Sequence, residues 1–228
     1  RNRHGACGAQ VSARERVRGR GRGYRGVPED TRRASNMFSL LYGFWMKMFE
    51  KIEHRVLVLG IDKAGKTTLL EQIKVQYKII AALKPSSILP TVGLNIAKVE
   101  LPSCRLVFWD LGGQSGLRSI WDKYYREADS VVFVIDCSEE STLNESMLVL
   151  EQTLASKDLV GVPVLIFANK QDVAGGISSS DLQSRFTRNS SIFDHHNLFV
   201  QGGSAFEGFG VKEGMSWLVE AMKRTHFT

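Results

Sequence analysis

Cysteine and long hydrophobic runs are both scarce in this sequence. Only three cysteines occur among 228 residues. No Cys-x-x-Cys pair or Cys/His cluster is present, which argues against a zinc site or a disulfide framework and favours a reducing compartment. The apolar stretch near the N-terminus, from Met37 to Phe49, covers 13 residues. A bilayer-spanning helix needs about 20 apolar residues, and no small-residue cleavage site follows, so neither a membrane span nor a signal peptide is predicted.

The net positive charge of the chain comes from its first 36 residues. This segment holds ten arginines and three acidic residues, a net charge of +7 against +6 for the whole chain. Its Arg/Gly run offers almost nothing apolar to bury, so we expect residues 1–36 to be disordered. The segment could be a nucleic-acid-binding tail of the RGG kind. Because the chain starts at Arg1 and Met37 could be the start codon, we favour a leader that is not native and expect no nucleic-acid partner.

After Met37, short apolar runs alternate with segments of helical spacing. The runs at 54–60, 130–136 and 163–169 are almost entirely apolar, as in strands buried on both faces of a parallel sheet. A strand pair at 92–100 and 105–110, a last strand at 197–201, and helices at 66–77, 141–156, 179–186 and 211–223 complete the predicted elements. This alternation predicts a doubly wound, mostly parallel α/β domain over 52–228. Ligands bind such folds beyond the carboxyl ends of the strands.

A phosphate-binding loop follows the first predicted strand. The tract GIDKAGKT, residues 60–67, matches G-x-x-x-x-G-K-[ST] and opens a predicted helix, which is the context that this motif requires. The glycines let consecutive N–H groups turn towards phosphate oxygens, Lys66 reaches the β- and γ-phosphates, and the Thr67 hydroxyl ligates Mg²⁺. The alternative is a glycine-rich turn without function. The residues predicted to bind nucleotide here are Gly60, Asp62, Lys63, Ala64, Gly65, Lys66, Thr67 and Thr68.

The tract Asn169-Lys170-Gln171-Asp172 ends the run 163–169 and predicts a guanine-binding loop. A carboxylate at Asp172 can accept hydrogen bonds from guanine N1–H and the 2-amino group, donors that adenine lacks there. Asn169 can brace the loop and contact N7, and the Lys170 stem can lie over the purine face. Ser204 and Ala205, after the last strand, are the expected second wall, with the Ala205 N–H facing guanine O6.

Two further segments predict contacts with Mg²⁺ and the γ-phosphate. In Asp110-Leu111-Gly112-Gly113-Gln114, Asp110 can hold Mg²⁺ through a water, Gly113 can offer its N–H to the γ-phosphate, and Gln114 can orient the attacking water. Thr91 can complete the Mg²⁺ shell, and loss of the γ-phosphate would release both loops. Gln114 could instead be a solvated residue at a helix start, and Thr91 an ordinary residue at a strand start. Arg118 is expected to serve packing or salt bridging.

In this order, GIDKAGKTT, PTVGLN, FWDLGGQ and NKQD resemble the Arf and Arf-like GTPases over about residues 37–225. The long stretch 75–89 and the absence of glycine after Met37 resemble the Arf-related branch. Leu94 stands where many Arfs carry phenylalanine in an exposed hydrophobic triad, whose other members here would be Trp109 and Tyr124. The choice of effector is therefore open.

The resemblance has consequences for fold, activity and partners. It implies a P-loop NTPase fold with a six-stranded sheet flanked by helices, and a small monomeric GTPase that binds GTP or GDP with Mg²⁺. It also implies an exchange factor, a GTPase-activating protein and trafficking effectors. The expected location is cytoplasmic and peripheral on Golgi or trans-Golgi membranes, with recruitment in the GTP state.

The segment 37–51 has the pattern of an amphipathic helix. Its polar side holds Ser39, Gly43, Lys47 and Glu50, and its apolar side Phe38, Leu41, Tyr42, Trp45, Met48 and Phe49. The helix could pack permanently on the domain or lie in a membrane interface. Without glycine after Met37 no myristoylation is expected, so a membrane-protein receptor would supply a second contact. In Arf-like proteins the strand pair slides when GTP binds and displaces this helix.

Three functions are compatible with the phosphate loop alone. They are a regulated GTPase switch, an interaction module that binds GTP with negligible turnover, and a P-loop ATPase or small-molecule kinase. Asp172 argues against the third. Because no arginine in the switch loops is clearly placed as a finger, we predict slow hydrolysis that depends on an activating protein in trans.

Overall fold

The computed structural model describes residues 51–79, 91, 93–189, 193 and 196–225. They belong to the compact unit Lys51–Thr228, and the remaining unit, Arg1–Glu50, lies outside the described residues. The leader predicted over 1–36 and, apart from Lys51, the amphipathic helix predicted over 37–51 therefore lie outside the described residues. No helix of the described part is long and apolar enough to cross a membrane.

A six-stranded sheet forms the centre of the domain, in the order β2-β3-β1-β4-β5-β6. Its strands are β1 (Ile52–Leu59), β2 (Leu94–Glu100), β3 (Cys104–Leu111), β4 (Ser130–Asp136), β5 (Val164–Asn169) and β6 (Leu198–Gly202). Only β2 is antiparallel to its neighbour, and the other four pairings are parallel. This confirms the predicted doubly wound, mostly parallel six-stranded α/β fold.

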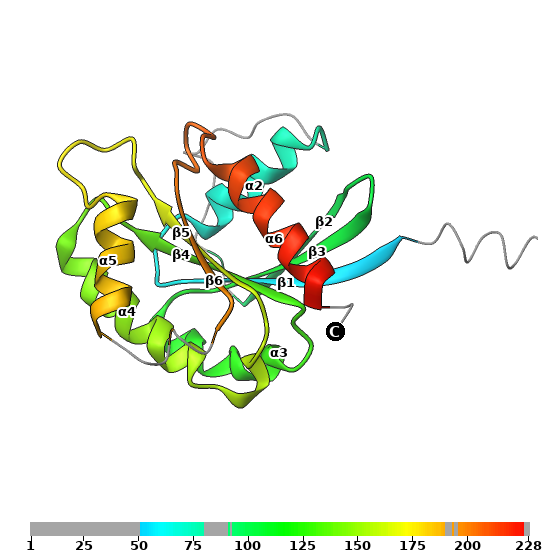
Figure 1. Ribbon diagram of the computed structural model, residues 1–228, viewed down its shortest axis with the longest axis horizontal. Coiled ribbons are helices and arrows are strands. Elements are labelled where there is room, and N and C mark those ends of the chain that lie inside the picture. The colour runs from blue at the N-terminus through cyan, green and yellow to red at the C-terminus, as the bar shows by residue number, and fades with distance from the viewer. Residues whose placement is uncertain (1–50, 80–90, 92, 190–192, 194–195, 226–228) are drawn as a thin grey trace, which may run out of the picture. The chain divides into compact units, whose positions relative to one another are not determined.

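Helices cover both faces of the sheet. The longer ones are α2 (Lys66–Gln76), α4 (Glu140–Leu154), α5 (Ser179–Asn189) and α6 (Val211–Thr225); the short ones are η2 (Ser115–Ile120), α3 (Asp122–Tyr125) and η3 (Lys157–Leu159). Helices α2 and α6 lie together over one face, and α4 and α5 lie over the other (Figure 1). Such cover on both faces explains why every residue of β4 and β5 is buried.

Sequence patterns located most elements to within three residues, with two kinds of difference. No element is predicted over the segment 115–125, and the structure has η2 and α3 there. Its helical turns are short, and the buried Trp121 that anchors them packs against other parts of the chain, so no local periodicity marks them. The strand predicted from 92 begins at Leu94 in the structure.

The parallel strands bring all the sequence motifs to one edge of the sheet. The phosphate loop follows β1, the Asp110 segment ends β3, the Asn169 tract ends β5, and Ser204 follows β6. The loop begins at Gly60 with φ 141°, and a Cβ there would collide with the backbone of Val134 in β4. Only glycine satisfies both the positive φ and this close approach.

Candidate functional site

The phosphate loop wraps around the ammonium group of Lys66. Its Nζ donates to the Ile61 carbonyl oxygen at 2.8 Å, and the side chain is buried at the start of α2. Burial lowers the pKa of Lys66, while the nearby Asp110 and Asp62 carboxylates oppose that shift. A cation held in a poorly solvated loop at a helix N-terminus is a site for anionic oxygens.

Thr67, Thr91 and Asp110 meet beside this loop. The Thr67 hydroxyl donates to Asp110 Oδ2 at 2.7 Å and lies 2.8 Å from the Thr91 hydroxyl, while Thr91 Oγ1 donates to Asp110 Oδ2 at 3.3 Å. The three residues come from α2, the segment before β2, and β3. The structure therefore brings together the three residues predicted to hold a metal.

The chemistry of this cluster fits Mg²⁺. All its donors are hard oxygens, which Mg²⁺ prefers, and Mg²⁺ is commonly held by one or two carboxylates together with substrate phosphates. Asp110 Oδ1 is buried and has no hydrogen-bond partner among the described residues. A buried oxygen of this kind is suited to accept a hydrogen bond from a water bound to the metal. Burial raises the pKa of this carboxyl group against the effect of its Thr67 hydrogen bond. Within the described ranges no group of three or more His, Cys, Asp or Glu residues forms a separate metal site.

Of the two glycines after β3, Gly113 lies against the phosphate loop and Gly112 lies against Thr91 and Gly93. A Cβ on Gly113 would collide with Lys66 Nζ and with the backbone at Gly60, so only glycine allows this approach. The Gly112 N–H donates to the Gly93 carbonyl oxygen at 3.0 Å. Gln114, the predicted catalytic residue, is exposed and occupies the N-cap position of η2. It lies at the rim of the site rather than inside it.

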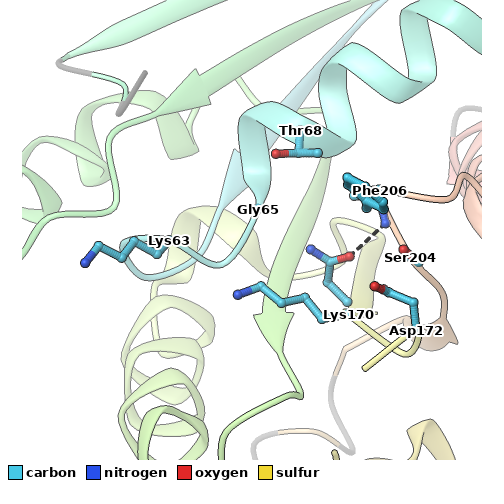
Figure 2. Close-up of a pocket in the computed structure, with 9 residues that line it drawn as sticks. Lys63, Gly65, Thr68, Lys170, Asp172, Ser204 and Phe206 are labelled. Atoms are coloured by element: carbon cyan, nitrogen blue, oxygen red, sulfur yellow. Dashed lines mark hydrogen bonds between the residues drawn. The ribbon is translucent and has the colours of Figure 1, made fainter. Parts of the chain in front are cut away.

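A cavity of about 280 Å³ adjoins the other side of the phosphate loop. Its lining comes from three loops and consists of Lys63, Gly65, Thr68, Asn169, Lys170, Asp172, Ser204, Ala205 and Phe206. Eight of these nine residues were predicted nucleotide-binding residues. Figure 2 shows Lys63, Lys170, Asp172 and Phe206 around the same space.

Asn169 ties the three loops of the cavity together. Its Nδ2 donates to the Ala64 carbonyl oxygen at 2.8 Å, and its Oδ1 accepts from the Ala205 N–H at 2.9 Å. The expected brace is therefore present. The Ala205 N–H, which we expected to face guanine O6, is instead donated to Asn169, because a buried backbone donor is paired with the nearest acceptor.

Lys170 and Asp172 flank this brace. Lys170 adopts φ 63°, and its ammonium group forms an ion pair with Asp136 at the end of β4. Its stem is therefore stretched along the cavity wall, and the Asp172 carboxylate is exposed to the cavity. Phe206 also lines the cavity, with 65% of its surface exposed, and was not among the predicted nucleotide-binding residues. Its position directly after Ser204 and Ala205 was the available signal.

Comparison with known proteins decides the family. The ADP-ribosylation factor family, Arf, matches residues 41–222 of this chain. The chain belongs to the Arf family. Like the other small GTPases of that family, it is a GTP-binding switch protein, and Arf-family GTPases hydrolyse GTP, bind GTP or GDP with Mg²⁺ and work with exchange factors, activating proteins and effectors. The family membership excludes the ATPase and small-molecule kinase alternatives.

The relatives agree with the predicted resemblance to the Arf-related branch. Over 189 residues the chain is 45% identical to ADP-ribosylation factor-related protein 1 of Homo sapiens, covering 82% of this chain and 94% of that protein. It is 34% identical to ADP-ribosylation factor-like protein 3 of Saccharomyces cerevisiae, covering 82% and 95%. Among solved structures, the Arl6 BBS3 small GTPase from Trypanosoma brucei with bound nucleotide analogue GppNp has a TM-score of 0.66 and 30% identity over 76% of this chain and 99% of that one.

Proposed function

We propose that this Arf-family protein alternates between GDP- and GTP-bound states and hydrolyses GTP slowly at the carboxyl edge of its sheet. The observation that carries the proposal is the meeting of Thr67, Thr91 and Asp110 beside Gly113 and Lys66. Two loops that are far apart in sequence thereby reach one phosphate site. Both can respond to the presence of a γ-phosphate.

The phosphates lie along the residues 60–68 in this proposal. Lys66 neutralises the β- and γ-phosphates, and the Gly113 N–H binds a γ-phosphate oxygen. Thr67 and Thr91 would hold Mg²⁺, with Asp110 acting through a water, and the ion would supply positive charge to offset that of the phosphate oxygens. The base occupies the cavity, with Asp172 accepting from N1–H and the 2-amino group and the Lys170 stem against its face. Asn169 holds the two loops on either side.

Gln114 is the proposed catalytic residue, and it orients the water that attacks the γ-phosphate. Its side chain is exposed in the structure and directly follows Gly113 in the chain. The guanidinium of Arg118 is engaged by Gly113 O and Glu145, so it does not serve as a finger. Rapid turnover therefore depends on an activating protein that supplies an arginine in trans.

One experiment tests nucleotide identity and turnover together. Nucleotide is extracted from purified protein and chromatographed, and single-turnover hydrolysis of GTP is then followed for the wild type and for Gln114→Leu. Guanine nucleotide in the extract, with hydrolysis in the wild type that is lost in the variant, supports the proposal. Adenine nucleotide would overturn it. Guanine binding without any hydrolysis would favour the alternative of an interaction module with negligible turnover.

The cellular role is proposed from the family and from the segment 37–51. In the GTP state the protein would be recruited from the cytoplasm to Golgi or trans-Golgi membranes, where it regulates vesicle trafficking through effectors. The amphipathic segment contacts the membrane surface, and a membrane-protein receptor supplies the second contact that one short unacylated helix needs. Fluorescence microscopy of tagged wild type, Thr67→Asn and Gln114→Leu proteins tests this. Identical distributions of all three would argue against nucleotide-dependent recruitment.

A further inference from the structure

Arg118 in η2 connects the glycine pair after β3 to helix α4. Its Nε donates to the Gly113 carbonyl oxygen at 2.9 Å, and its terminal nitrogen donates to Glu145 Oε1 at 2.7 Å. The Arg118 side chain is 20% exposed and that of Glu145 52% exposed. Arg118 was expected to serve packing or salt bridging, but one of its two partners is the backbone of the proposed γ-phosphate loop.

The peptide planes on both sides of Gly113 are oriented by side-chain donors. The buried Trp121 donates its indole N–H to the Gly112 carbonyl oxygen at 3.1 Å. In a trans peptide the carbonyl and the following N–H point in opposite directions. Trp121 therefore sets the direction of the Gly113 N–H, and Arg118 in the same way sets the direction of the peptide that leads into Gln114.

The arrangement held by these donors is the one in which both nucleotide-sensing loops touch the phosphate loop. Gly113 lies against Lys66 so closely that a Cβ would collide. Thr91 lies within hydrogen-bond distance of Thr67. The Arg118 side chain can hold Gly113 O and Glu145 together only while the glycine pair stays in this position, because both acceptors lie within reach of one guanidinium group.

We propose that Arg118 is a positioning residue that, anchored by Glu145, latches the Gly113 loop to helix α4 in the GTP state. The latch rests on the proposed roles of Gly113 and Gln114. Loss of the γ-phosphate removes the hydrogen bond that the Gly113 N–H makes to it in the proposed function. The Arg118–Glu145 contact is then released. The latch stabilises the GTP complex and orients Gln114, but it contributes nothing to the GDP complex.

The test measures dissociation of fluorescent GppNp and GDP, together with single-turnover GTP hydrolysis, for Arg118→Gln, Glu145→Gln and the double variant. We expect GppNp to leave about fivefold faster and hydrolysis to slow by a similar factor, the size of one partly exposed charge-assisted hydrogen bond. GDP dissociation should stay within twofold of the wild type. The double variant should be no worse than Arg118→Gln alone, because both substitutions break one unit.

Two controls separate a latch from an ordinary surface ion pair. Glu140→Gln breaks the 2.9 Å ion pair between Arg185 and Glu140, which also joins α4 to a neighbouring element but does not reach the nucleotide loops. This variant should change the dissociation rate of neither GppNp nor GDP. The exchanged pair Arg118→Glu with Glu145→Arg restores the ion pair but not the donor to Gly113 O, so it should not rescue GppNp retention.

Several outcomes would overturn the latch. They are equal acceleration of GppNp and GDP release, effects no larger than those of Glu140→Gln, or full rescue by the exchanged pair. Gln114→Leu is measured in the same series. If Gln114→Leu hydrolyses GTP normally, the catalytic assignment under the proposed function fails, while the ratio of GppNp to GDP release still decides the latch.

Discussion

At the scale of single residues, the site depends on side chains that serve two loops at once. Asn169 is the clearest case, since its amide accepts from Ala205 and donates to Ala64. An aspartate there would lose the donor to Ala64, and an alanine would lose both contacts and leave two buried backbone groups unpaired. Base specificity, by contrast, depends on a residue that the brace leaves exposed, Asp172.

The first prediction concerns Asp172→Asn. The amide presents a single acceptor or an NH₂ group to two guanine donors, and an unmatched polar contact costs about 1–3 kcal/mol. We expect GTP affinity to fall roughly 5- to 150-fold. Xanthosine triphosphate, which carries an oxygen in place of the 2-amino group, should be bound better by the variant than by the wild type.

Competition against fluorescent GDP measures these affinities. Glu207→Gln is the matched control, because Glu207 is an exposed acid in the neighbouring loop outside the lining of the cavity. The guanine assignment of Asp172 would be abandoned if ATP displaced fluorescent GDP from the wild-type protein as well as GTP does.

The second prediction concerns Cys137, which directly follows β4 and is fully buried. Burial raises the pKa of its thiol to about 12, with a further contribution from Asp136. Because the folded pKa lies above the ordinary value of 9.0, this group favours the folded state below about pH 9, and that contribution is lost as the pH rises towards 12.

Thiolate is the reactive species, so at pH 8 native Cys137 should react with iodoacetamide orders of magnitude more slowly than a free cysteine peptide. Peptide mass spectrometry locates the label. Labelling of Cys137 in native protein at the rate of the free peptide would contradict both its burial and its raised pKa.

At the scale of elements, helix α4 both closes one face of the sheet and carries Glu145. Its buried side includes Leu143, Met147 and Leu150, all facing the core, whereas Leu148 is 55% exposed. The helix is therefore fixed by apolar packing, and its polar residues are free to contact neighbouring elements. This division is what an amphipathic helix on a sheet requires.

The third prediction compares two leucines of α4. Leu150→Ala removes a fully buried side chain and should lower the free energy of unfolding by about 2–5 kcal/mol. Leu148→Ala, on the exposed side of the same helix, should change it by about 0.5 kcal/mol or less. Urea unfolding of the GDP-bound proteins gives both values. Equal losses would mean that Leu148 is covered in solution.

At the scale of the whole molecule, the register of β2 on β3 decides whether Thr91 reaches the phosphate site. Leu94 pairs with Leu111 and Asn95 with Asp110, and in this register Thr91 meets Thr67. A shift of the pair would withdraw Thr91 from the phosphate site. Because a one-residue slip reverses the face of every side chain, an allowed shift covers an even number of residues.

The fourth prediction concerns the segment before the domain. If residues 37–49 compete with the GTP state through this strand pair, coupling must be reciprocal. Deleting them should then raise the preference for GTP over GDP by at least about fivefold, the lower end of usual coupling energies. Nucleotide affinities of 37–228 and 50–228 are compared, with liposome flotation in each state.

The chain 1–228 is the control, since 37–228 differs from it only by the segment 1–36. If deletion left the ratio of GTP to GDP affinity unchanged and flotation were the same in both nucleotide states, the segment 37–49 would simply be part of the core.

What the sequence determined by itself is local. The alternation of apolar runs predicted the parallel sheet, and contiguous tracts identified the phosphate loop, Asp110–Gln114 and the Asn169 tract, because each spacing reflects bond geometry among neighbours in the chain. The tertiary structure alone decided which distant residues meet. Thr91 with Thr67, Asn169 with Ala205, and Arg118 with Glu145 are separated by 24, 36 and 27 positions. Such contacts depend on crossovers and on the packing of helices against the sheet, which leave no periodic signal in the residues that make them.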